Sequence, residues 1–245
     1  MDVTVGEQPH RRSPDSRAAP ASDEAVFRLI DVIKIYREAD VETVALRGVD
    51  LVVASGEFVA VMGRSGSGKS TLLNLLAGLD RPSAGRVLFR GRDLAMADDA
   101  ERSAIRGREI GIVYQDQNLA PMLSLLENVR LAAWLAGRPL EASGARAHLS
   151  RLALADREAH RPDQLSGGEQ QRAALACVFA AAPHVLLADE ITGELDSHTA
   201  GTVLEAVRDT HRTAGTTVVL VTHDPGVAGT ADRVIELRDG RVAEH

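Results

Sequence analysis

A glycine-rich segment between an apolar run and a run of helical spacing constrains this 245-residue chain more than any other feature. Residues 58–62 are continuously apolar, as in a parallel strand that is covered on both faces. From Thr71 to Leu79, leucines recur at helical spacing. The segment between them, residues 63–70, reads Gly-Arg-Ser-Gly-Ser-Gly-Lys-Ser and fits the pattern G-x-x-x-x-G-K-[ST]. A strand, a glycine turn and a helix in this order predict a loop that binds phosphate groups.

The residue types of this loop suit that chemistry. Glycines let successive backbone N–H groups turn toward an anion, and the helix N-terminus adds its positive end. We expect Lys69 to bridge the β- and γ-phosphates of a nucleotide and Ser70 to offer its hydroxyl to Mg²⁺. A flexible Gly/Ser turn without a ligand is the alternative, and the flanking strand and helix disfavour it. The predicted nucleotide-binding residues here are Gly63, Arg64, Ser65, Gly66, Ser67, Gly68, Lys69, Ser70 and Thr71.

Two carboxylates follow another apolar run, residues 185–188. On its own, an acidic pair after a strand more often indicates a turn or a helix cap. In an open α/β sheet, however, ligands bind at the carboxyl ends of the strands. Together with a phosphate loop, the pair predicts that Asp189 holds Mg²⁺ through water and that Glu190 takes a proton from an attacking water.

Composition excludes several classes of protein. The net charge of −7 argues against a general binder of nucleic acids or anionic membranes. Cys177 is the single cysteine, so the chain has no intrachain disulfide and no cysteine-rich zinc site. No apolar run approaches the ~20 residues that cross a bilayer. Lysine occurs only at Lys34 and Lys69, so the position of each carries information.

Strand-like and helical segments alternate along the chain, which predicts an α/β fold with a parallel sheet. Residues 1–24 are rich in Pro, Arg and Ser and lack a run of large apolar residues, so we expect a disordered tail. A mostly helical block over residues 119–182 interrupts the alternation, with breaks at 137–139 and 161–163. The other segments expected to be regular are strands at 27–32, 49–53, 86–90, 110–114 and 217–221, a helix at 197–212, and an edge hairpin with a turn at 239–240.

Residues 165–172 read Leu-Ser-Gly-Gly-Glu-Gln-Gln-Arg. Ser166 and Glu169 fit a capping box, and alone they would indicate only a well-capped helix. In the company of the phosphate loop and the acidic pair, this segment resembles the signature of the nucleotide-binding subunits of ABC transporters. The resemblance covers residues 26–244. It implies that Ser166, Gly167 and Gly168 face the γ-phosphate of an ATP molecule held by a second subunit.

Further residues match that family in the family's order. The resemblance implies that Tyr36 stacks on adenine and that Gln115 contacts Mg²⁺ and the attacking water. It also implies that Asp196 lies in a loop crossing the dimer interface and that His223 touches the γ-phosphate. On this basis the predicted catalytic residues are Glu190, His223 and Gln115, and the predicted metal ligands are Ser70, Gln115 and Asp189.

The resemblance implies a fold and a function. The fold is a P-loop NTPase (RecA-like) parallel sheet core with an N-terminal antiparallel β subdomain and a helical subdomain inserted at about 117–182, all within an ATP-binding domain at 25–245. The function is hydrolysis of ATP, with Mg²⁺, by a subunit that dimerises around two ATP molecules. The dimer would be a homodimer, or a heterodimer with a related subunit.

Such a subunit drives separate transmembrane permease subunits from the cytoplasmic side of the cell membrane, where it is peripheral. Residues 44–51, 56–63 and 78–82 resemble most the ATPases of the macrolide-export and lipoprotein-release types. Two alternatives remain open: a soluble ABC-type ATPase, and the ATPase partner of a non-transporting cell-envelope complex. The acidic balance and the absence of cysteine pairs in the helical block disfavour members that act on nucleic acid, and no nucleic acid partner is expected.

Two positions depart from the family pattern. Ile191 stands where a proline usually follows the catalytic glutamate, so the orientation of Glu190 is less restrained than proline would make it. Cys177 lies in the helix after the signature where an arginine is usual. With no activating base nearby in sequence, we expect it to be a buried and unreactive thiol.

Overall fold

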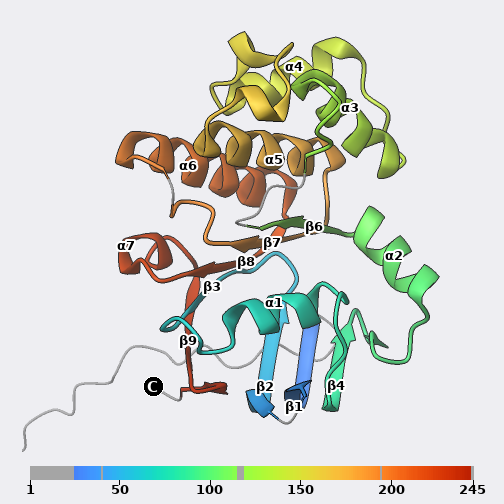
Figure 1. Ribbon diagram of the computed structural model, residues 1–245, viewed down its shortest axis with the longest axis vertical. Coiled ribbons are helices and arrows are strands. Elements are labelled where there is room, and N and C mark those ends of the chain that lie inside the picture. Colours follow the sequence, from blue (N-terminus) through green and yellow to red (C-terminus); the bar gives the residue numbers. More distant parts are fainter. Residues whose placement is uncertain (1–24, 40, 115–118, 194, 244–245) are drawn as a thin grey trace, which may run out of the picture.

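The structure is a computed structural model, and it describes residues 25–39, 41–114, 119–193 and 195–243. A layer of helices covers one side of a central sheet, and a second sheet lies on the other side (Figure 1). The tail expected at residues 1–24 and the predicted site residue Gln115 both lie outside the described residues.

The central sheet has the strand order β10-β9-β3-β8-β7-β6. Its neighbours pair in parallel except for the edge pair β9–β10, which is the antiparallel hairpin expected from the sequence. The parallel α/β class predicted from the sequence is therefore confirmed. The strands are β3 (Phe58–Met62), β6 (Ile110–Val113), β7 (Val185–Asp189), β8 (Thr217–Thr222), β9 (Arg233–Arg238) and β10 (Arg241–Val242).

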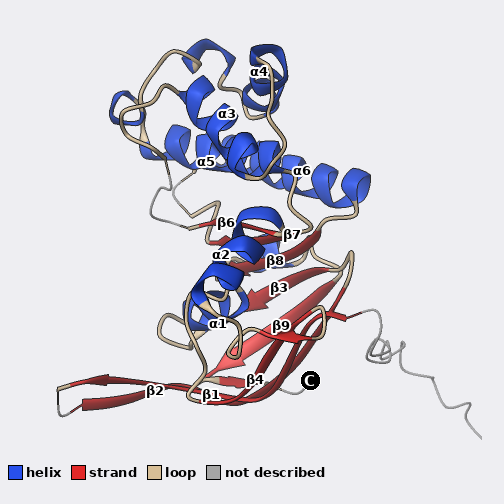
Figure 2. Cartoon of the chain, turned by 90° about the vertical axis from the view of Figure 1, so that its right-hand side faces the viewer, coloured by secondary structure: helices blue, strands red, loops and turns tan. Residues whose placement is uncertain are grey.

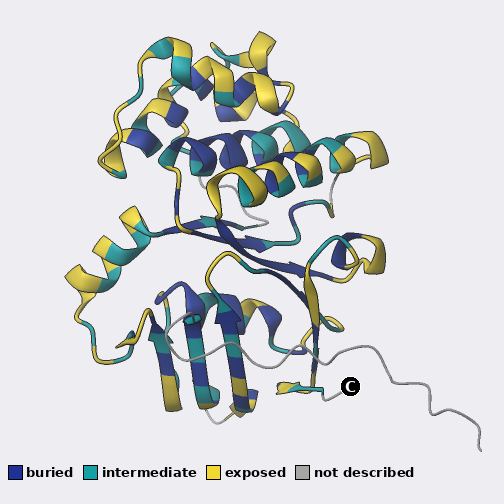
Figure 3. Ribbon diagram, turned by 180° about the vertical axis from the view of Figure 1, so that it is seen from behind, coloured by how far each residue is buried: buried dark blue, intermediate teal, exposed yellow. Residues whose placement is uncertain are grey.

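The continuous apolar runs have a direct cause in the packing of this sheet. Side chains of β8 alternate between two separate cores: Val218 and Leu220 pack with the helical layer, whereas Val219 and Val221 pack on the opposite face. Figure 3 shows β3, β7 and β8 buried along nearly all of their length. A strand covered on both faces therefore carries apolar side chains along its interior, and in β8 only the two end positions are threonines.

The second sheet is antiparallel, with the order β2-β1-β4-β5. Its strands are β1 (Ala25–Glu38), β2 (Val41–Ala54), β4 (Ala84–Phe89) and β5 (Arg92–Asp93). β1 and β2 are longer than the strands expected at 27–32 and 49–53, and their outer halves project from the body as a hairpin (Figure 2). These halves are half-buried or exposed, so apolar patterning does not reveal them; backbone pairing such as Tyr36 with Thr43 defines them.

The helical block contains α3 (Leu125–Leu135), α4 (Ala142–Arg151) and α5 (Gly167–Ala181). Its two predicted breaks are present. Gly137 follows α3 with a φ of +76°, a left-handed conformation that suits glycine, and Pro162 begins a short 3₁₀ turn ahead of α5.

The other helices lie around the central sheet: α1 (Lys69–Leu76), α6 (Ser197–Ala214) and α7 (Pro225–Ala228), with α2 (Asp99–Arg108) at its margin. The sequence did not predict α2, because this helix buries no residue and so carries no apolar stripe. Within the described part of the chain, no helix is long and apolar enough to cross a membrane.

The register of the parallel strands brings the predicted motifs to one edge. Met62 of β3 pairs with Thr222 of β8, and Asp189 of β7 pairs with Val221 of the same strand. The glycine-rich loop follows β3, the acidic pair begins at the last residue of β7, and His223 follows β8. Segments far apart in the sequence therefore meet at the carboxyl edge of the sheet.

Candidate functional site

A pocket of about 800 Å³ opens at this edge and collects most of the predicted site residues. β2 contributes Thr43, Val44 and Ala45 to its wall, which sequence reasoning missed because ordinary strand residues carry no motif. The predicted residues that line the pocket are Tyr36, Ser65, Gly66, Gly68, Lys69, Ser70, Thr71, Asp189, Glu190 and His223.

The side chain of Lys69 hydrogen-bonds back to the start of the glycine-rich loop. Its side chain is buried, and Nζ donates hydrogen bonds to the carbonyl oxygens of Gly63 at 2.8 Å and Arg64 at 3.0 Å. Gly68 precedes α1 with a φ of +104°, and a Cβ there would lie 2.5 Å from the carbonyl oxygen of Ala45. Glycine is thus required at residue 68 both for its backbone conformation and for space, and the loop holds a cation beside the start of α1.

Arg64 and Ser67 lie on the other side of the loop. They line a second cavity of about 500 Å³ together with residues 236–239. Gly63 is packed against the same region, since a Cβ at this position would lie 2.3 Å from the carbonyl oxygen of Leu237. These three predicted residues shape the loop from behind, whereas the main pocket is lined by other members of the segment.

Ser70 and Asp189 form a pair of oxygen donors in the pocket. Oγ of Ser70 donates to Oδ2 of Asp189 at 2.9 Å. Burial raises the pKa of Asp189, the hydrogen bond from Ser70 opposes that rise, and the negative charge of Glu190 adds to it. A hydroxyl and a carboxylate are ligands that Mg²⁺ accepts, and a cation here would offset the cost of the buried charge, so the two residues fit this metal.

Glu190 is held in place by its backbone as well as by its side chain. Its φ is +49°, in the left-handed region. Its N–H donates to the carbonyl oxygen of Val221 at 3.0 Å, and its own carbonyl accepts from the N–H of Gly193 at 3.0 Å and from Nε2 of Gln171 at 3.4 Å. Its Oε1 lies 3.1 Å from Nδ1 of His223. The backbone of Glu190 is therefore held by β8, by α5 and by its own turn, and His223 contacts its carboxylate.

The two residues that depart from the family pattern, Ile191 and Cys177, are both buried in the structure. Ile191 is fully buried in the core beneath the helical layer, which anchors the chain directly after Glu190 without the ring of a proline. Cys177 is buried in α5, and burial raises the pKa of its thiol to about 12. The expectation of a buried, unreactive cysteine agrees with this environment.

Tyr36 lines the pocket at the level of the projecting hairpin. Its hydroxyl donates to Oδ2 of Asp80 at 3.0 Å, and Lys34 lies with Nζ 4.8 Å from the ring centroid. Sequence reasoning assigned no role to Asp80 or Lys34. The rarity of lysine was the one signal that pointed to Lys34.

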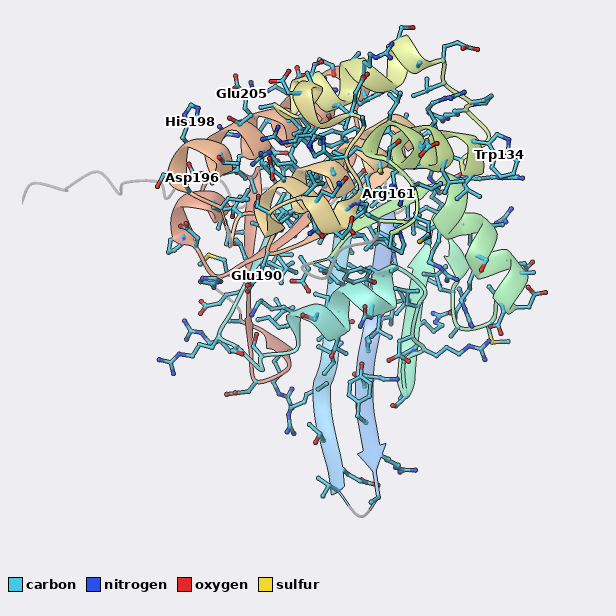
Figure 4. The ribbon with its side chains drawn as sticks, turned by 45° about the horizontal axis from the view of Figure 1, so that its top comes forward. Trp134, Arg161, Glu190, Asp196, His198 and Glu205 are labelled. Atoms are coloured by element: carbon cyan, nitrogen blue, oxygen red, sulfur yellow. The ribbon has the colours of Figure 1, made fainter. Side chains whose placement is uncertain are left out.

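The predicted signature residues and Asp196 lie outside the pocket, at the N-termini of α5 and α6. Ser166 accepts a hydrogen bond from the N–H of Glu169 as the N-cap of α5, so the predicted capping box is confirmed. The carboxylate of Asp196 caps α6 in the same way, accepting from the N–H groups of His198 and Thr199. Figure 4 shows Asp196 and His198 together at the start of α6, far from Trp134. Ser166, Gly167, Gly168 and Asp196 are not among the residues that line the pocket of their own chain.

Residues 46–193 match the family model described as ABC transporter. This chain belongs to the ABC transporter family. The sequence-based prediction of its family and of its P-loop NTPase fold is therefore confirmed, and so is its class as an ATPase. A chance likeness of separate motifs is excluded because the match is continuous over more than half of the chain.

Comparison with two bacterial relatives shows what share of each relative's length this ABC family member covers. It is 48% identical over 220 residues to the pyoverdine export ATP-binding/permease protein PvdT of Pseudomonas putida, covering 89% of this chain and 34% of PvdT. It is 43% identical over 227 residues to the lipoprotein-releasing system ATP-binding protein LolD of Xanthomonas oryzae pv. oryzae, covering 92% of this chain and 93% of LolD. The chain thus spans about a third of the first relative and nearly all of the second.

Solved structures of ATP-binding cassettes share the same architecture. The dimeric post-hydrolysis state of the cassette MJ0796 bound to ADP and Pi has a TM-score of 0.85 and 39% sequence identity, covering 89% of this chain and 97% of that one. A second dimeric structure of MJ0796 has a TM-score of 0.84 at 41% identity. The family's fold extends across nearly all of the described residues.

Proposed function

We propose that this chain hydrolyses ATP as one half of a dimer that closes over two ATP molecules, and that it drives separate membrane permease subunits. The observation that carries the proposal is the single pocket in which Lys69, the pair Ser70–Asp189 and the pair Glu190–His223 meet. These groups are a phosphate-binding cation, two oxygen ligands and a candidate base with a polar partner. They are the parts that transfer of a phosphoryl group to water requires.

Each residue has a part in this reaction. Lys69 and the N–H groups at the start of α1 bind the phosphates. Ser70 and Asp189 would hold Mg²⁺, which neutralises charge on the phosphates when it is bound. Glu190 accepts a proton from the attacking water, and His223 keeps that carboxylate directed into the pocket.

Dimerisation follows from the residues that the pocket lacks. The signature residues 166–168 begin a helix whose N-terminus carries a positive end, yet they line no part of their own chain's pocket. In a dimer, this helix start would face the γ-phosphate in the partner. The dimeric MJ0796 structures support such an arrangement. Gln115, outside the described residues, keeps its expected role at the metal and the water.

A permease partner is supported by the names of the relatives, which are a pyoverdine export protein, macrolide export proteins and a lipoprotein-releasing system. We infer an export or mechanical type of system with this chain on the cytoplasmic face, where ATP is available. The apolar residues near Gln115 form the docking surface that the sequence suggests for the permease: Leu119, Pro121, Met122, Leu123, Leu125 and Leu126. Of these, Pro121 and Met122 are exposed, whereas Leu125 is fully buried in the core.

Two variants test the proposal. Lys69→Ala removes the cation at the phosphates, so we expect ATP affinity measured by calorimetry to fall by at least tenfold. Glu190→Gln keeps the size of the side chain and removes the base, so ATP should bind normally while phosphate release slows by about 10²–10⁴-fold. Unchanged ATP affinity in Lys69→Ala, or undiminished hydrolysis in Glu190→Gln, would contradict the assignment of that residue.

A further inference from the structure

One of the two lysines serves the phosphate loop, and the other lies beside Tyr36, which lines the same pocket. Lys34, on β1, is largely buried, with only 12% of its side chain exposed. Its Nζ lies 2.6 Å from Oδ1 of Asp80 and 2.9 Å from the carbonyl oxygen of Arg81, and it sits over the ring of Tyr36. Only two of the 28 lysines and arginines in the chain are lysines. One of these two brings its compact ammonium group to this position.

Asp80 is the centre of this small cluster. Besides Lys34, it accepts hydrogen bonds from the hydroxyl of Tyr36 at 3.0 Å and from the N–H of Arg81 at 2.7 Å. Burial alone would raise the pKa of Asp80, but the hydrogen bonds from Lys34, Arg81 and Tyr36 outweigh it and hold the pKa below its usual value. The carboxylate therefore stays charged at neutral pH and keeps both side chains as partners.

Both ends of the cluster are attached to regular structure. Lys34 and Tyr36 belong to β1, and Asp80 follows α1, where its N–H donates to the carbonyl oxygen of Asn74 at 3.3 Å. The turn after Asp80 is hydrogen-bonded to β1. The N–H of Ser83 donates to the carbonyl oxygen of Ile33 at 2.8 Å, and the N–H of Ile35 donates to Oγ of Ser83 at 2.9 Å. α1 itself starts at Lys69, so one helix joins the phosphate end of the pocket to Asp80.

We propose that Asp80 and Lys34 are positioning residues that hold the ring of Tyr36 as a platform for the purine base of the nucleotide. The ammonium of Lys34 occupies one face of the ring, which leaves the other face to the base. This inference rests on the proposed function, since it assumes that the pocket takes ATP. It assigns the two residues a part in base binding, while Lys69 and Ser70 bind the phosphates.

A purely structural cluster would behave differently. If Asp80 and Lys34 only fasten the hairpin to α1, their loss should weaken every ligand of the pocket alike. If they position the ring, their loss should weaken only ligands that carry a base. ATP and inorganic tripolyphosphate, each with Mg²⁺, separate these cases because tripolyphosphate has the phosphates and no base.

The experiment measures the dissociation constants of both ligands by calorimetry for the wild-type chain and five variants. Asp80→Ala, Lys34→Met and Tyr36→Ala should each weaken ATP, by about tenfold for Tyr36→Ala, and leave tripolyphosphate unchanged within twofold. The double variant Asp80→Ala/Tyr36→Ala should bind ATP no more weakly than Tyr36→Ala. The matched control is Glu42→Ala, which breaks an exposed ion pair with Arg37 on the same hairpin and should change neither ligand.

The outcomes separate this inference from the proposed function. Equal weakening of both ligands, or unchanged ATP affinity in Asp80→Ala and Lys34→Met, would overturn the positioning role alone. If Asp80→Ala does not fold, Lys34→Met decides, because it keeps the aliphatic stem and removes only the charge. A wild-type chain that binds neither ATP nor tripolyphosphate would overturn the proposed function together with this inference.

Discussion

At the scale of the residue, Asp189 is placed for binding at a cost to stability. Its pKa is raised in the folded chain, mainly by burial. The protonated carboxyl therefore stabilises the fold fully below the unperturbed pKa of 3.8, and this stabilisation is lost as the pH rises through the folded pKa. At pH 8 without Mg²⁺ the charged carboxylate therefore costs stability, and Asp189→Asn should have a higher melting temperature than the wild type. The difference should shrink as the pH falls toward 4, and Mg²⁺-ATP should stabilise the wild type more than the variant.

Melting curves from circular dichroism at pH 8 and pH 5, with and without Mg²⁺-ATP, check this expectation. Asp163→Asn, at an exposed position outside the pocket, is the matched control and should melt with the wild type at both pH values. If Asp189→Asn melts below the wild type at pH 8, the hydrogen bond from Ser70 contributes more than the burial of the charge costs.

At the scale of the element, two helices share one capping device and differ in proposed function. Ser166 caps α5 with Glu169, and Ser124 caps α3 with Glu127. Replacing either serine with alanine should destabilise the fold by about 1 kcal/mol in urea denaturation. Only Ser166→Ala should also slow ATP hydrolysis, because only the start of α5 is proposed to face a phosphate. Equal hydrolysis rates in the two variants would reduce Ser166 to a helix cap.

The environment of Glu169 adds a pH dependence to the same helix. The N–H of Ser166, the guanidinium of Arg157 and the hydroxyl of Ser166 lower the pKa of Glu169 to about 2. The stability that these contacts contribute is present above the unperturbed value of 4.5 and is lost as the pH falls toward 2. The start of α5 is therefore stable throughout the pH range in which ATP hydrolysis would be measured.

At the scale of the whole molecule, ATP should act as the link between two chains. Because a ligand bound across an interface stabilises the dimer by mass action, Glu190→Gln should be monomeric without nucleotide and dimeric with ATP in light scattering. Adding Ser166→Arg on the same chain places bulk and charge at the proposed interface and should abolish that dimer. A mixture of the double variant with Glu190→Gln should regain at most one composite site per dimer. If Glu190→Gln stays monomeric at ATP concentrations well above its dissociation constant, even with its permease present, the signature residues do not bind the partner's ATP.

Much of the site could be predicted from the sequence because its chemistry lies in short segments. The phosphate loop is contiguous from Gly63 to Ser70, and the acidic pair directly follows a buried strand, so spacing and neighbours reveal both. The capping box of Ser166 and Glu169 is equally local. The buried strands could also be predicted, because packing on both faces selects apolar side chains along the interior of each strand.

Other features depended on which distant segments come together, and only the tertiary structure decided them. Lys34 and Asp80 lie 46 residues apart and meet through the pairing of β1 and the turn after α1. The backbone of Glu190 is held by Gln171 on the signature helix and by Val221 on the neighbouring strand. Such contacts are set by strand register and by the packing of helices on a sheet. No local pattern encodes them, because each partner alone is an ordinary residue in an ordinary element.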